Sequence, residues 1–298
     1  MNANNSNAEH FTAGMALRQA LDANEFVIAP GCYDALSARI AESHGFGAVY
    51  MSGLAVTASM LARPDLELLG MAEMVRQAGL ITSAVGIPVI ADADTGYGGL
   101  ASVERTTRAY IQAGVAAIHL EDQASPKRCG QMGGVRLLDP DTMMAKLRVA
   151  VEARADSDML IIGRTDAFRV AGIKEAVSRA NLYAQTGVDV LFVDGVTLPD
   201  DFRHVRAAVK GRLLASIVEV DAPAKTQAKE LKEMGYSIAI FAISSIQATA
   251  GALNRLMADI KTNGTTNLSF KDMLPYSPLN KLVGIEHYHQ LWDRLSQD

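Results

Sequence analysis

PVIADAD (88–94) begins the stretch of sequence that decides the fold, as an apolar, β-branched run that ends in aspartates. A helix-like run, SVERTTRAYIQAG (102–114), follows it and closes on glycine, the residue preferred just past a helix end. A second apolar run, AAIHLED (116–122), comes next. This order predicts two parallel strands whose outer face is covered by a helix.

The same alternation extends over most of the chain. Eight apolar runs are typical of buried strands: FVIAPG (26–31), AVYMSG (48–53), PVIADAD (88–94), AAIHLED (116–122), MLIIGRTD (159–166), VDVLFVDG (188–195), RLLASIVE (212–219) and SIAIFA (237–242). Further helix-like runs lie between them: 71–85, 142–155, 174–187 and 226–235. Eight such units in roughly 250 residues predict an α/β fold of the (β/α)8 TIM-barrel type. A doubly wound open sheet is the alternative, but no GxGxxG follows the first strand and eight units exceed the usual number of about six.

Three regions are expected along the chain. Residues 1–10 form a disordered tail, residues 11–262 form the barrel, and residues 263–298 form a C-terminal helical extension. The extension contains the amphipathic run LNKLVGIEHYHQLWDRL (279–295), which lies outside the eight units. Its apolar side chains need a surface to cover, either the barrel or another subunit.

Composition and charge exclude several classes of function. The net charge is −5 with scattered Lys and Arg, so nucleic acid and anionic membranes are not expected partners. The start of the chain lacks the features of a signal peptide, and no apolar run approaches the roughly 18 residues of a membrane span. The two cysteines, Cys32 and Cys129, match neither a disulfide framework nor a zinc pattern. We therefore expect a cytoplasmic protein.

Catalytic groups of such barrels lie at the C-terminal ends of the strands, where this chain places carboxylates. The third strand ends in Asp92-Ala93-Asp94, and a period of two would direct both carboxylates to one side. Glu121, at the end of the fourth strand, adds a third oxygen donor. Such a set, without His or Cys, favours Mg²⁺ or Mn²⁺ over zinc. The alternative is a cluster of helix caps and turns.

Cys129 follows two cations in the run PKRCG (126–130). Neighbouring Lys127 and Arg128 are expected to stabilise the thiolate and lower the pKa of the thiol. Gly130 allows the backbone to approach a ligand and the segment to move. The alternative is a surface loop with an incidental cysteine.

Other polar side chains also fall at strand ends. Arg164 must be paired, either with a substrate carboxylate or with a barrel carboxylate in an internal salt bridge. Tyr50, Ser52 and Gly53 can offer hydroxyl and N–H groups to an anion, although a packed tyrosine and a turn is the simpler interpretation. The histidines, His119 included, have no evident partner and are interpreted as packing or surface residues.

The ordered set of motifs resembles the isocitrate lyase and phosphoenolpyruvate mutase family, most closely its short lyases. The motifs are YMSG (50–53), PD (64–65), ADADTGYG (91–98), HLEDQ (119–123), KRCG (127–130) and GRTDA (163–167). The resemblance implies an α/β barrel that forms a homotetramer and exchanges its last helical segment between subunits. It also implies Mg²⁺ near Asp92, Asp94 and Glu121. KRCG is typical of the lyases within this family.

The resemblance further implies a carbon–carbon lyase that acts on a small carboxylate. A 2-hydroxy acid would lose its hydroxyl proton, with Tyr50 assisting, and would split between C2 and C3. Cys129, on a closing loop that also carries Lys127, would protonate the departing fragment. Residues implied to hold the substrate are Tyr50, Ser52, Gly53, Leu54, Gly130, Gln131, Arg164, Asp194, Ser216 and Gln247.

Departures from methylisocitrate lyases concentrate on the substrate side. Gln131 stands where those lyases carry His, Asp194 replaces Glu, and Ser216 opens SIVE in place of NITE. Gln247 and Pro278 stand where two arginines hold distal carboxylates. A buried carboxylate without a charged partner costs about several kcal/mol, so we predict an alkylmalate-like dicarboxylate as substrate. Methylisocitrate lyase, an oxaloacetate decarboxylase or hydrolase, a phosphonate enzyme and a non-catalytic binding protein are the alternatives.

Overall fold

Eight parallel strands close into a barrel in their sequence order, with β1 pairing to β8. The structure, a computed structural model, describes residues 12–296. The strands are β1 (Val27–Cys32), β2 (Val49–Met51), β3 (Val89–Asp92), β4 (Ala117–Glu121), β5 (Leu160–Thr165), β6 (Val190–Val193), β7 (Leu213–Ile217) and β8 (Ile238–Phe241). All eight predicted strands are confirmed, and the closed order excludes the open-sheet alternative. The expected tail, residues 1–10, lies outside the described part of the chain.

Helices surround the barrel and extend beyond it. They are α1 (Ala13–Asp22), α2 (Ala35–Ser43), α3 (Gly53–Leu61), α4 (Met71–Thr82), α5 (Leu100–Gln112), α6 (Pro140–Arg154), α7 (Ala167–Tyr183), α8 (Pro199–Ala208), α9 (Ala228–Met234), α10 (Ser244–Asn263), α11 (Tyr276–Leu282) and α12 (Ile285–Leu295). The predicted helix 174–187 starts earlier, at Ala167, and contains a kink at Gly172, where φ is 83°. Within residues 12–296 no helix combines the length and the apolar character needed to cross a bilayer.

Two apolar clusters make up the core. One fills the barrel with inward side chains such as Ile90, Ile162 and Ile240, and Leu17 of α1 packs against it. The other lies between the strands and the surrounding helices, where Ile118 and Tyr183 are fully buried. Strands covered on both faces need apolar residues at successive positions, which explains their continuous apolar runs. This packing holds the strand ends, and the polar side chains on them, in fixed positions.

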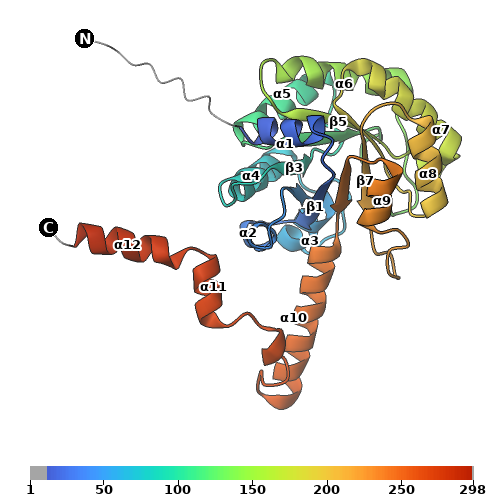
Figure 1. Cartoon of the computed structure of the whole chain (residues 1–298). Coiled ribbons are helices and arrows are strands. Elements are labelled where there is room, and N and C mark those ends of the chain that lie inside the picture. The colour runs from blue at the N-terminus through green and yellow to red at the C-terminus, as the bar shows by residue number, and fades with distance from the viewer. Residues whose placement is uncertain (1–11, 297–298) are drawn as a thin grey trace, which may run out of the picture.

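The C-terminal helices leave the barrel. Figure 1 shows α10 extending away from the strands, with α12 projecting at the far end of the chain. Large apolar side chains on this part are exposed, among them Leu268, Phe270, Tyr276 and Trp292, with exposed fractions between 61% and 81%. Such a surface is unusual for a protein that functions as a monomer. Residues 264–296 form the C-terminal arm of the protein.

Candidate active site

One pocket lies at the C-terminal ends of the strands and collects most of the predicted site residues. Twelve of them line it: Tyr50, Ser52, Leu54, Asp92, Lys127, Cys129, Gly130, Gln131, Arg164, Asp194, Ser216 and Gln247. As formed by residues 12–296, the wall does not include Gly53, Asp94 or Glu121. Gly53 still contributes to the site, because its N–H donates to Asp92 Oδ2 over 3.2 Å. A Cβ there would lie only 2.7 Å from the same oxygen, so the close approach requires glycine.

Asp92 and Asp94 do not share a face through strand periodicity, as the sequence had led us to expect. Strand β3 ends at Asp92, and Asp94 has a left-handed φ of 49°. Its backbone N–H instead donates to Asp92 Oδ1 over 2.9 Å. The turn still places both carboxylates near Gly53, with their oxygens within 3.4 Å of a Cβ built there. The two groups converge, but a turn brings them together and not an extended strand.

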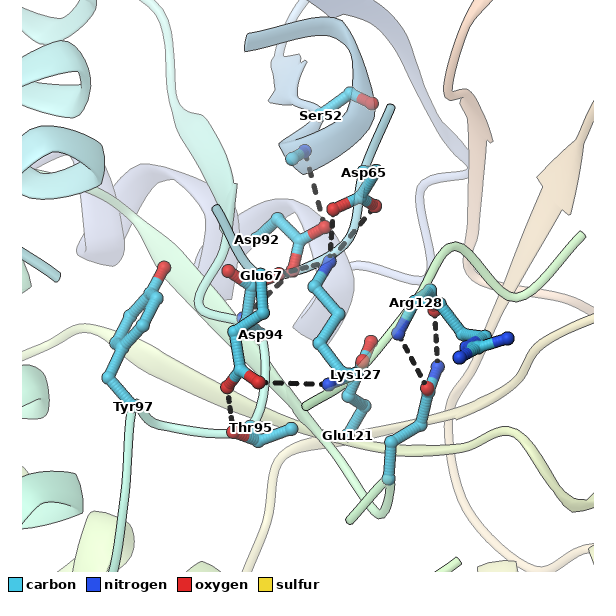
Figure 2. A network of polar contacts seen from close by, with 12 residues as sticks. Ser52, Asp65, Glu67, Asp92, Asp94, Thr95, Tyr97, Glu121, Lys127 and Arg128 are labelled. Carbon is cyan, nitrogen blue, oxygen red and sulfur yellow. Dashed lines mark hydrogen bonds and ion pairs between the residues drawn. The ribbon is translucent and has the colours of Figure 1, made fainter. Parts of the chain in front are cut away.

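Lys127 reaches into this group of carboxylates (Figure 2). Its Nζ lies 2.8 and 2.9 Å from the two oxygens of Asp65 and 2.5 Å from Asp94 Oδ1. Asp94 Oδ1 has this ion pair and no further polar partner among the described residues. Burial disfavours the ammonium, but Asp94, Glu121 and Asp65 raise the pKa of Lys127 well above its usual value. Lys127 therefore neutralises part of a dense negative charge.

The buried carboxylates differ in how well their charge is compensated. Burial raises the pKa of Asp94 to about 7 despite Lys127, and burial raises that of Glu121 well above its usual range despite Arg164. Burial also acts on Asp92, but its contact with His119 and the charges of Lys127 and Arg164 lower its pKa below the usual range. Asp92 is therefore the ionised carboxylate of the three that faces the pocket.

These residues fit a hydrated divalent cation. Glu121 Oε1 is a buried oxygen without a hydrogen-bond partner in the described part of the chain, and Asp94 Oδ1 has only its ion pair with Lys127. In residues 12–296, no three acidic, His or Cys side chains converge closely enough to hold an ion on their own, so water would have to complete the coordination shell, as expected from the sequence. Mg²⁺ usually keeps several waters and takes one or two carboxylates directly. Asp92, Asp94 and Glu121 are the residues that would hold such an ion, which would supply Lewis-acid polarisation of a bound oxygen.

The protonation state of Cys129 differs from the one predicted from the sequence. Its cationic neighbours in sequence point elsewhere, since Lys127 pairs with Asp65 and Arg128 Nη1 donates to the Gly133 carbonyl oxygen over 3.1 Å. Burial, with a smaller contribution from Asp65, raises the pKa of Cys129 to about 11. The expected thiolate is therefore wrong, and the side chain is a protonated thiol at neutral pH. A protonated thiol can act as an acid but not as a nucleophile.

Arg164 is held by three carboxylates, so the internal salt bridge of the sequence analysis is confirmed. It pairs with both oxygens of Asp166 at 2.8 and 3.0 Å, with Asp194 at 2.8 Å and with Glu121 at 3.2 Å. The guanidinium nevertheless lines the pocket beside Asp194. Gly130 of the cysteine loop packs against this group so closely that a Cβ would clash with Asp194 and Asp166.

His119 has a partner that sequence inspection missed. Tyr50 Oη lies 2.8 Å from His119 Nε2, and both side chains are buried. Burial lowers the pKa of His119 to about 4, so the imidazole is neutral. Burial and the charge of Asp92 raise the pKa of Tyr50 well above its usual value, which opposes its predicted help as a base. Period-two spacing from Glu121 on β4 was the available signal for His119.

The part of the pocket wall formed by the ends of β7 and β8 differs in chemistry from the part that carries the carboxylates and Lys127. Residues from the ends of β7 and β8 contribute Val218, Val220 and Ile243 together with the acidic Glu219 and Asp221. In the described chain, no Lys or Arg lines the pocket from these two ends. The amide of Gln247 donates to the Glu219 carbonyl oxygen over 3.0 Å, so one of its two N–H groups is already engaged.

Asp65 is the other site residue that lacked an assigned role. The dipeptide PD (64–65) stood among the motifs, but only the structure shows its contact with Lys127. Its carbonyl oxygen also accepts from the Cys129 N–H over 3.0 Å. Asp65 therefore holds the segment that carries the candidate acid, through both the Lys127 side chain and the Cys129 backbone.

A TIM barrel with buried carboxylates, a paired lysine and a protonated cysteine at its C-terminal end defines an enzyme fold and a site of the metal-assisted carboxylate type. Residues 17–261 match the family described as phosphoenolpyruvate phosphomutase. The chain belongs to this family, within the PEP mutase/isocitrate lyase superfamily.

Similar proteins include several enzymes. The 2,3-dimethylmalate lyase of Eubacterium barkeri is 38% identical over 275 residues, which cover 92% of this chain and 95% of that protein. The 2-methylisocitrate lyase of Aeropyrum pernix is 38% identical over 277 residues, covering 93% and 89%.

Solved structures agree with this placement. A 2,3-dimethylmalate lyase structure superposes with a TM-score of 0.89 at 39% identity and 95% coverage of each chain. An oxaloacetate acetylhydrolase bound to 3,3-difluorooxalacetate has a TM-score of 0.91 at 32% identity, covering 96% of this chain and 98% of that one. A phosphonopyruvate hydrolase in complex with oxalate and Mg²⁺ has a TM-score of 0.86 at 29% identity, covering 95% and 99%.

Proposed function

We propose that this protein is a Mg²⁺- or Mn²⁺-dependent carbon–carbon lyase that cleaves an alkylmalate-like 2-hydroxy dicarboxylate. The products are a 2-oxo acid, such as pyruvate, and a short carboxylate. The observation that carries the proposal is the asymmetry of the pocket. Carboxylates, Lys127 and Cys129 lie at the ends of β3 and β4, and apolar side chains without a cation lie at the ends of β7 and β8.

The polar side of the pocket supports the chemistry. A divalent cation bound near Asp92 would polarise the oxygens of the 2-oxo acid portion. Ser52 and Leu54 lie at the N-terminal end of α3, and Arg164 lies beside them on the wall, where they can hold that portion. Lys127 offsets the negative charge that the substrate would otherwise meet at Asp65 and Asp94.

Protons can be assigned to specific groups. The substrate hydroxyl loses its proton, and the carboxylate of Asp194, whose pKa burial raises above its usual range, is the candidate acceptor. The C2–C3 bond then breaks, and its electron pair stays with the C3 fragment. Cys129 delivers its thiol proton to that carbon, which is the role of a general acid. Gly130 and Gln131 cover the pocket beside it.

The apolar side supports a small substrate. A third carboxylate near Val218 and Val220 would face Glu219 and Asp221 without a cationic partner. Its burial would cost about several kcal/mol. Methyl groups on C3 of an alkylmalate would instead contact alkyl side chains.

A substrate panel tests the proposal directly. Purified protein with Mg²⁺ is given malate, methylmalates, 2,3-dimethylmalate, methylisocitrate, isocitrate and oxaloacetate, with pyruvate, glyoxylate, oxalate and carbon dioxide measured separately. We expect a dicarboxylic alkylmalate to exceed methylisocitrate in kcat/KM by about ten- to a hundredfold, the equivalent of one charge-assisted contact. Methylisocitrate as the best substrate would make the protein a methylisocitrate lyase. Oxalate or carbon dioxide from oxaloacetate alone would make it a hydrolase or a decarboxylase.

The proposal includes an oligomeric state and a cellular location. The exposed apolar side chains of the C-terminal arm support a homotetramer in which the arm packs on a neighbouring subunit. Cys32 and Cys129 are both free thiols, which supports a location in the cytoplasm.

A further inference from the structure

His119 is fixed so firmly that its protonated nitrogen can be inferred from its surroundings. The ring is fully buried on β4. It stacks on Tyr50 with an interplanar angle of 18° and a centroid distance of 5.7 Å, and it meets Phe192 edge-on at 5.8 Å. Packing on both rings leaves the imidazole little freedom to rotate.

The two ring nitrogens face different surroundings. Nε2 lies 2.8 Å from Tyr50 Oη and 3.6 Å from Asp92 Oδ1, so two oxygens surround it. Nδ1 is buried and has no hydrogen-bond partner among residues 12–296. A hydrogen on Nδ1, in either the neutral or the protonated imidazole, would therefore be a buried donor without an acceptor.

This asymmetry favours one tautomer. With the hydrogen on Nδ1, a buried donor would be left without an acceptor, and the lone pair of Nε2 would point at the Asp92 carboxylate. With the hydrogen on Nε2, the donor finds Tyr50 Oη, and Asp92 adds a favourable field. Orphaned buried N–H groups are rarer in proteins than orphaned acceptors.

The tautomer determines what Tyr50 can do. If His119 donates to Tyr50 Oη, the hydroxyl hydrogen of Tyr50 cannot lie along the same contact. Tyr50 lines the pocket beside Asp92. Its O–H is then free to donate to a ligand oxygen there.

We propose that His119 is a positioning residue which, as the Nε2–H tautomer, presents the Tyr50 hydroxyl as a hydrogen-bond donor to the C2 oxygen of the bound 2-oxo acid. The identity of that ligand rests on the proposed lyase function. The tautomer itself does not, because it follows from contacts within the chain. Tyr50 thus stabilises negative charge on the oxygen and does not act as the base.

Nitrogen NMR of the full-length protein tests the tautomer without any turnover. The protein is labelled with ¹⁵N-histidine, loaded with Mg²⁺, and measured with and without oxalate as a planar mimic of a 2-oxo acid enolate. The His119 signals are assigned by their loss in His119→Gln. We expect a pyrrole-type Nε2 and a pyridine-type Nδ1 in both states. A protonated Nδ1 with an unprotonated Nε2 would overturn the proposal.

A double-mutant cycle tests the coupling to Tyr50. Oxalate affinity is measured by calorimetry in the presence of Mg²⁺ for Tyr50→Phe, His119→Leu, His119→Gln and the double variant Tyr50→Phe/His119→Leu. We expect Tyr50→Phe and His119→Leu each to weaken binding about tenfold, the equivalent of one hydrogen bond. His119→Gln keeps an N–H near the position of Nε2 and should stay within about threefold of the original.

The double variant distinguishes positioning from packing. His119→Leu should have no further effect once Tyr50 is phenylalanine, because the hydroxyl that His119 orients is gone. Additive losses, or a His119→Gln variant as weak as His119→Leu, would overturn the proposal. His204→Gln, an exposed histidine on α8, serves as the matched control and should bind oxalate normally. A panel without any cleavage, together with the expected tautomer and coupling, would reject the lyase function and keep the role of His119.

Discussion

Because Cys129 is protonated at neutral pH, we expect the rate of cleavage to depend on its ionisation at high pH. Burial raises its pKa to about 11 from an ordinary 9.0, so the acid form persists through neutral pH and is lost only as the pH rises toward 11. We expect the decrease in kcat caused by Cys129 ionisation to begin above pH 9. Alkylation by iodoacetamide, which needs the thiolate, should be slow at pH 7.5 and accelerate with rising pH. Rapid alkylation at neutral pH would contradict this assignment.

Replacing the sulfur tests the same residue directly. Cys129→Ser keeps the size but supplies a much weaker acid, so cleavage should fall about 10²-fold or more while oxalate still binds. Cys32→Ala is the matched control, because Cys32 is buried in β1 outside the pocket wall and should retain activity. Near-normal turnover of Cys129→Ser would remove Cys129 as the acid.

The carboxylates near Gly53 predict dependence on a divalent cation. Chelation with EDTA should abolish cleavage, and Mg²⁺ or Mn²⁺ should restore it. Asp92→Asn should weaken Mg²⁺ binding in calorimetry more than Asp139→Asn, an exposed helix cap that serves as a control. Activity that survives thorough chelation would count against the metal.

At the scale of an element, the loop that carries Cys129 is held by a short neighbouring segment. Glu67 Oε2 accepts from Ser125 Oγ over 2.7 Å and from the Lys127 N–H over 2.9 Å. Asp65 holds the Lys127 ammonium and the Cys129 N–H from the same side. Segment 65–67 therefore fixes the position of the candidate acid.

Removing Glu67 should release that loop. Glu67→Ala loses both hydrogen bonds to the loop, so we expect kcat to fall and Cys129 alkylation at pH 9 to rise, each by about tenfold. Glu67→Gln keeps an acceptor oxygen and should lie between the two. Glu104→Ala, which breaks an exposed ion pair on α5, is the control and should change neither rate. Unchanged alkylation in Glu67→Ala would show that the loop is held elsewhere.

The barrel strands were predictable from the sequence, because all their residues must be buried. All eight strands were found, because a strand buried on both faces must be apolar throughout, and Asp92 and Arg164 were placed at strand ends for that reason. The partnership of His119 with Tyr50 was not, since it joins β4 to β2 across the barrel interior. The charge on Cys129 was missed because burial outweighed its neighbours in sequence, whose side chains bind other groups.

The exposed apolar side chains of the C-terminal arm predict that the protein assembles through contacts between the arm and a second copy of the chain. Deleting residues 264–298 should convert the proposed tetramer into smaller species, as measured by light scattering, because the arm exposes Phe270, Tyr276 and Trp292. The barrel core of the described structure does not include these side chains, so the truncated protein should stay folded by circular dichroism. A tetramer that survives the deletion would show that the arm is not the contact.

Trp292 has a further use in the laboratory, because it is the chain's single tryptophan. It lies on α12 and is 70% exposed in one chain. An indole in water emits at longer wavelength than one covered by apolar groups, so the intrinsic fluorescence of this enzyme reports on the arm and not on the barrel. A dilution series that follows the wavelength of maximum tryptophan emission would therefore give the affinity between subunits without any label.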